Sequence, residues 1–163
     1  MTMLADAGGA GEVIGQAVEP VVDVLERIVA ARTIGDIIAG VKPGAVARVG
    51  EAAAAFGLLS DDAIYTEIAA DEAIAVLTSV IHHDMAYHAE IVPQKTAREL
   101  AEAFVGGFTA DGTRFFTNGT FGRRPPAPHI GRSWRPATEA TFDTGVLVIG
   151  PSSFACLWFQ DED

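Results

Sequence analysis

The densest group of reactive side chains in this 163-residue chain lies within residues 82–90. Asp84 and His88 are four residues apart there, which is the spacing of side chains that meet on adjacent helical turns. If the helix predicted just before them continues, both fall on its apolar face, where neither should be unpaired. One hypothesis is therefore functional: Asp84 orients His88 as a general base, or both bind a metal together with His129 or Asp143.

Two structural interpretations compete with this hypothesis. In the first, the helix ends near His83 and Asp84 is a loop or capping residue. In the second, Asp84 and His88 form a buried hydrogen bond that only stabilises the fold. The spacing does not match a zinc pattern such as HExxH, so we predict no metal site and can name no cofactor.

Asp143 is the second residue that stands out, because it interrupts a strand pattern. Its face of the predicted strand also carries apolar residues, so the carboxylate needs a partner if that face is buried. We expect Arg114 or an arginine of the loop that lies between them to supply it. Gly145 would allow either a neighbouring chain or a ligand to approach the backbone closely.

Charge is distributed unevenly along the chain. Residues 112–138 contain five arginines and no acidic residue, so this segment holds +5 of a net charge of −11 and leaves −16 for the rest. Its prolines and glycines predict an irregular loop. The arginines could simply pair with the acidic surface, or they could form a clamp for a small anion or a docking loop for an acidic partner. The residues predicted to bind such a ligand are Arg114, Arg123, Arg124, Arg132, Trp134 and Asp143.

Composition excludes several classes of protein. With 22 acidic and 11 basic residues, the surface would repel nucleic acid and anionic membranes, so neither is an expected partner. A single cysteine excludes a disulfide scaffold. The first eleven residues lack the positive charge of a signal peptide, and glycines with a proline interrupt the longest uncharged run. We expect a cytoplasmic protein with a flexible lead-in at residues 1–11.

Helical patterns dominate the first two thirds of the chain. In residues 12–29 the polar side chains occupy one narrow sector, so we expect this helix to be covered on more than one side, by its own chain or by a second subunit. Residues 33–36 fit a capping box for a short helix, and Pro43 suits the first turn of another. Two further amphipathic helices are predicted to begin at Asp71 and Thr96.

The pattern changes to strands near Arg114. Short β-prone runs occur at residues 114–117, 140–149 and 154–159, and the last two are apolar on both faces. We therefore predict an α+β fold in which a helical first two thirds is followed by a C-terminal antiparallel meander of about three strands. One domain of residues 1–163 is expected, with a helical arm at 12–59 involved in oligomerisation and an α+β core at 60–163.

Two functions fit these observations. The first is a non-catalytic binding or homo-oligomeric assembly module, expected to be a dimer, with the basic loop free to bind a small anion or an acidic partner. The second is a small hydrolase for anionic substrates, including phosphorylated ones, that uses Asp84 and His88 with arginines of the loop. A shared cleft for Asp84, His88 and the loop would favour the hydrolase.

Overall fold

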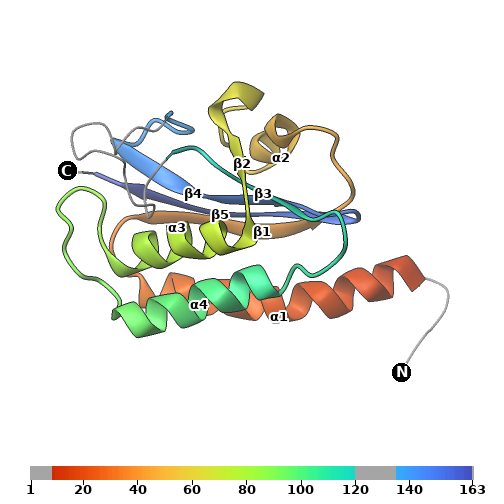
Figure 1. The fold of residues 1–163 in the computed structure, drawn as a ribbon, viewed down its shortest axis with the longest axis horizontal. Helices are drawn as coiled ribbons and strands as arrows, with labels where there is room; N and C mark the ends of the chain where they lie inside the picture. Colours follow the sequence, from red (N-terminus) through yellow and green to blue (C-terminus); the bar gives the residue numbers. More distant parts are fainter. Residues whose placement is uncertain (1–8, 120–134, 163) are drawn as a thin grey trace.

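The chain forms a five-stranded antiparallel sheet with helices on both faces (Figure 1). The computed structural model describes residues 9–119 and 135–162, and for residues 9–19 it describes the backbone only. The strand order is β1-β5-β4-β3-β2. The elements in chain order are α1 (Gly9–Ala31), β1 (Asp36–Pro43), α2 (Val49–Ala55), the 3-10 turn η1 (Asp62–Ile64), β2 (Thr66–Ile68), α3 (Ala70–His82), α4 (Gln94–Gly106), β3 (Arg114–Thr117), β4 (Phe142–Ile149) and β5 (Ser153–Asp161).

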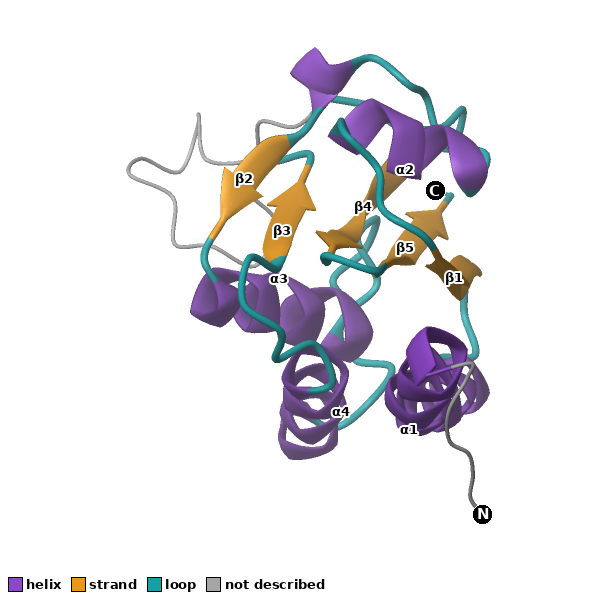
Figure 2. Cartoon of the chain, turned by 90° about the vertical axis from the view of Figure 1, so that its right-hand side faces the viewer, coloured by secondary structure: helices purple, strands orange, loops and turns teal. Residues whose placement is uncertain are grey.

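Two hydrophobic cores lie on opposite faces of the sheet. The larger core joins one sheet face to α1, α3 and α4, with α3 against β3 and β4 and α1 against β1 and α4 (Figure 2). The smaller core joins the other face to α2 and η1, and includes Trp158, Cys156 and Leu147. Since side chains alternate between faces along a strand, β4 and β5 must be apolar on both sides to serve both cores.

The structure confirms several sequence-based predictions. α1 includes the helical pattern of residues 12–29, and α3 and α4 lie where the amphipathic patterns placed them. β3, β4 and β5 occupy the three predicted strand regions. A Cβ on Gly145 of β4 would overlap the carbonyl oxygen of Leu157 on β5, so this glycine allows a neighbouring strand to approach, not a ligand.

The predicted sheet, however, is wrong. The sheet has five strands, and β1 and β2 come from the part of the chain that was expected to be helical. The capping-box pattern at residues 33–36 does not begin a helix, because the next residues form β1 and place Ile37 and Ile38 against the two opposite cores. A short apolar run gives too little periodicity to distinguish a strand from a buried helix, although β-branched residues favour the strand.

The length and hydrophobicity of the helices decide whether any of them could cross a membrane. In the part of the chain that the structure describes, no helix is long and apolar enough to cross a membrane.

Candidate functional site

The loop after α3 is organised by the Asp84 carboxylate. α3 ends at His82, so the helical spacing no longer applies to the residues that follow. Asp84 Oδ1 accepts a hydrogen bond from the backbone N–H of Ala86 at 2.9 Å, and Oδ2 accepts one from that of Tyr87 at 3.0 Å. The Asp84 carbonyl accepts a third from the backbone N–H of His88 at 3.0 Å. The first of the two structural interpretations is the one observed: the helix ends and Asp84 stabilises a turn.

Asp84 and His88 nevertheless line one cavity, together with His83. Its volume is about 20 Å³, which is room for about one water molecule. Asp84 is buried, whereas His88 is exposed and has a left-handed backbone with φ of 58°. The cavity therefore brings an acid and two imidazoles together without space for an organic substrate.

Three histidine rings lie close together at this end of the molecule, tilted against one another. The centroids of His82 and His83 are 3.8 Å apart, and those of His83 and His88 are 5.6 Å apart. Burial lowers the pKa of His83, and the neighbouring His82 and His88 rings lower it further. The arrangement thus favours a neutral His83 imidazole at pH 7. Within the residues described, no cluster of three or more His, Cys, Asp or Glu side chains is placed to hold a metal ion.

A buried ion pair lies next to this loop. Arg32, at the end of α1, donates from Nη2 to Asp161 Oδ2 at 2.7 Å and from Nη1 to Asp161 Oδ1 at 3.0 Å. Arg32 Nε also donates to the carbonyl of Val80 at 2.7 Å, and Asp161 Oδ2 accepts from the backbone N–H of Met85 at 2.9 Å. Both charged side chains are almost fully buried. The pair therefore joins the ends of α1, α3 and β5.

Asp143 lies at the centre of a second buried network. Its Oδ1 accepts from Asn118 Nδ2 at 2.9 Å and from Trp158 Nε1 at 3.1 Å, while Oδ2 accepts from Thr138 Oγ1 at 3.0 Å. The backbone N–H of Ala137 donates to Oδ1 at 3.1 Å. These partners are uncharged, so the expected pairing with an arginine is wrong for Arg114. The network holds residues 118 and 137–138 against β4.

The described arginines of the basic segment contact their own chain. Arg114 forms a bidentate ion pair with Glu67 across β2 and β3, at 2.8 and 3.2 Å, and its hydrogen bonds lower the pKa of Glu67. Arg135 Nη1 donates to the carbonyl of Ala63 at 2.8 Å. The remaining predicted residues lie outside the described part of the chain: Arg123, Arg124, Arg132, Trp134 and His129.

A larger hollow lies beside Arg135. This groove has a volume of about 480 Å³ and is lined by Leu59, Ser60, Asp61, Ile64, Arg135 and Pro136. Its two charged residues are already engaged, since Asp61 Oδ1 accepts from the backbone N–H of Ala63 at 2.9 Å and Arg135 donates to the carbonyl of the same residue. The groove therefore offers mainly an apolar surface.

Exposed apolar side chains gather where α1 meets β1. Among the described residues, the large exposed apolar side chains are Val22, Val29, Ile34, Leu59 and Tyr87. The first three belong to α1 or to its connection with β1, and Val22 and Val29 are two helical turns apart, on one stripe. Figure 2 shows α1 beneath β1 at one border of the sheet. We refer to residues 20–43 as the α1/β1 border.

Comparisons with family models, curated proteins and solved structures found no match. Evidence for a function therefore comes from this chain's own side chains.

Sequence reasoning missed two of these features. It did not predict the buried pair of Arg32 and Asp161, because the two residues are distant in sequence and each looks like an ordinary surface charge. It also missed the exposed strand β1, although the β-branched residues Ile37, Ile38 and Val41 were a signal for it.

Proposed function

We propose that this protein is a non-catalytic homo-oligomeric assembly module, most simply a dimer, and that the α1/β1 border is its contact surface. The observation that carries the proposal is that Val22 and Val29 of α1 and Ile34 of its connection to β1 all expose apolar side chains. Apolar surface gathered in one region of an otherwise charged protein is typical of an interaction site.

The buried acids support a structural role for the remaining polar residues. Asp84, Asp143 and Asp161 each accept two or more hydrogen bonds from their own chain. Carboxylates held in this way stabilise turns and element ends. These structural roles are compatible with an assembly module, which needs no catalytic group.

Two parts of the functional hypothesis remain predictions. Binding of a small anion or an acidic partner depends on Arg123, Arg124 and Arg132, which lie outside the described residues. Hydrolysis by Asp84 and His88 gains no support from their cavity, which has room for about one water molecule.

Sedimentation equilibrium tests the assembly proposal. We expect the native protein to have twice the chain mass of 17.1 kDa. Val29→Lys should shift the mass toward that of one chain, because it places a charge in the apolar contact, while the circular dichroism spectrum stays unchanged. Leu59→Lys is the matched control: Leu59 is 53% exposed and Val29 is 48% exposed, but Leu59 lies away from the border. A single-chain mass for the native protein at every concentration would contradict the proposal.

A further inference from the structure

β1 is a long edge of the sheet with an unpaired side. In the described chain, β5 is its sole strand neighbour, whereas the opposite edge is β2, of three residues. The central residues of β1, 37–41, carry no charge, and the two charged side chains, Asp36 and Lys42, lie near its ends. Natural proteins protect long edges with central charges, prolines or bulges, because an exposed edge pairs with another strand. β1 has such protection at its ends alone.

The hydrogen bonds of β5 show which backbone groups of β1 face outward. Gly44 N–H donates to the carbonyl of Ser152 at 2.9 Å, and these two residues continue the register of Pro43 with Ser153. In an antiparallel ladder, hydrogen-bonded residues alternate with residues that direct their N–H and C=O the other way. The even-numbered residues of β1 therefore face β5, and Ile37, Ala39 and Val41 face outward.

The β4–β5 hairpin gives the same assignment independently. Gly150 N–H donates to the carbonyl of Ser153 at 2.8 Å, so the odd-numbered residues of β5 face β4 and the even-numbered ones face β1. Pro43, which has no N–H, falls in the outward set of β1, where it removes no bond to β5. A third strand can thus bond to the outer edge without disturbing the sheet.

We propose that two copies of this chain pair antiparallel through β1, with Ala39 on the two-fold axis, to form one continuous ten-stranded sheet. This inference rests on the proposed assembly function and specifies its geometry. In this register Ile37 lies opposite Val41 of the second copy, and Asp36 lies opposite its Lys42. The two-fold axis makes each of these pairs occur twice.

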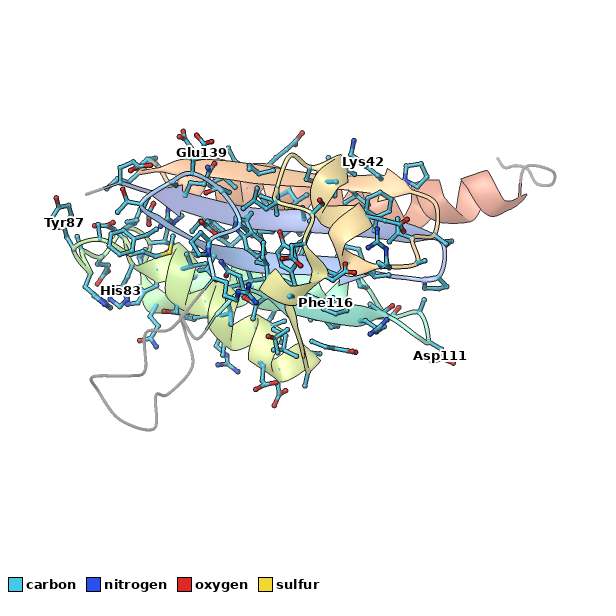
Figure 3. All side chains as sticks on the ribbon, turned by 90° about the horizontal axis from the view of Figure 1, so that it is seen from above. Lys42, His83, Tyr87, Asp111, Phe116 and Glu139 are labelled. Atoms are coloured by element: carbon cyan, nitrogen blue, oxygen red, sulfur yellow. The ribbon has the colours of Figure 1, made fainter. Side chains whose placement is uncertain are left out.

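Charge complementarity selects this register. Opposite charges directly across an antiparallel pair stabilise it, and like charges destabilise it. A shift of two residues in either direction would place Asp36 opposite Gly40 or Gly44, and Lys42 would lose its acidic partner. Lys42 is exposed, with its Nζ 5.4 Å from the centre of the Phe56 ring, and Figure 3 shows it at the border of the molecule that β1 forms.

The same pairing places the two α1 helices on one face of the joined sheet. α1 packs against β1, so an axis through Ala39 and perpendicular to the sheet brings the second α1 beside the first, in the opposite direction. The exposed stripe of Val22 and Val29 belongs to this helix. Burial of that stripe between the two helices would add apolar contact to the backbone hydrogen bonds of the strands.

Disulfide trapping tests the register. Asp36→Cys and Lys42→Cys are prepared separately, mixed and oxidised. Asp36 and Lys42 are both even-numbered, so they form a non-hydrogen-bonded pair with a Cα separation of about 4.5 Å, which a disulfide can span. We expect the mixture to form a covalent dimer and each variant alone to form none, because identical positions would lie six residues, about 20 Å, out of register.

A charge exchange provides the second test. Asp36→Lys should weaken dimerisation at least fivefold in Kd, and the double variant Asp36→Lys with Lys42→Asp should restore it, with circular dichroism confirming that each variant is folded. If the native protein is a dimer but the mixture does not cross-link and the exchange does not restore dimerisation, the strand pairing is overturned while assembly stands. If the native protein is a single chain at every concentration, both proposals fail.

Discussion

Asp143 shows what one side chain can determine in this fold. It lies at the start of β4, is fully buried, and accepts hydrogen bonds from Asn118, Ala137, Thr138 and Trp158. The donors come from both ends of the basic segment and from β5. One side chain thus satisfies donors from three separate parts of the chain.

Asp143→Asn should destabilise the protein by about 3 kcal/mol, because an amide NH₂ would face donors and leave at least one of them unsatisfied. Urea unfolding monitored by Trp fluorescence measures this change. Asp111→Asn is the matched control, since Asp111 is exposed in the turn before β3, and should leave the free energy of unfolding nearly unchanged. A loss below about 1 kcal/mol for Asp143→Asn would show that the network contributes little.

Sequence reasoning found Asp143 but not its partners. A carboxylate inside an apolar strand pattern is visible in the sequence, because it breaks the alternation. The donors to it are not, since Trp158 reaches it through the pairing of β4 with β5 and Asn118 through the pairing of β3 with β4. For Asp84, too, the local sequence could not decide among three interpretations. The end of α3 at His82 in the structure decided among them.

At the scale of elements, three chain segments meet at the Arg32–Asp161 pair. Arg32 follows α1, Asp161 ends β5, and the carbonyl of Val80 belongs to the last turns of α3. The pair also lies beside Gly35, where a Cβ would overlap the Asp161 carboxylate and where φ is +79°. The connection from α1 into β1 is therefore fixed by this ion pair.

Arg32→Met should cost about 3–5 kcal/mol of stability, because it leaves the buried Asp161 charge with the Met85 amide but no cation. Chemical denaturation measures the loss. Arg98→Met, which breaks the exposed pair with Glu102 inside α4, is the control and should cost about 0.5 kcal/mol or less. Equal losses for the two variants would mean that the buried ion pair of Arg32 contributes no more to stability than the exposed pair of Arg98.

Helices and strands were predicted correctly where the pattern of apolar residues repeated over a long enough segment. α3 and α4 each repeat an apolar face over several turns, and β4 and β5 are apolar on both faces because they lie within the sheet. β1 was missed because it is only eight residues long and follows a capping-box pattern. Such a segment is compatible with a helix as well as with a strand. Its partner β5 lies more than a hundred residues away, so no local signal could decide.

At the scale of the whole molecule, the overall charge limits where copies of the chain can meet. The net charge of −11 favours repulsion between copies, so association requires a region where that charge is low. Residues 37–41 of β1 are uncharged, and Val22 and Val29 expose apolar side chains on α1, with the exposed Glu26 one helical turn from each. The α1/β1 border therefore combines an unpaired strand edge with apolar side chains, and it is the surface on which copies of an acidic protein can meet.

If copies do meet there, thermal stability must depend on protein concentration, since unfolding then also separates the chains. For a dimer of this chain length, a hundredfold increase in concentration above the dissociation constant should raise Tm by roughly 3–5 °C. Differential scanning calorimetry of the native protein and of Val29→Lys measures this. The variant should show a Tm independent of concentration if it has become a folded single chain. The same concentration dependence in both proteins would place the contact elsewhere, because Val29 would then lie outside it.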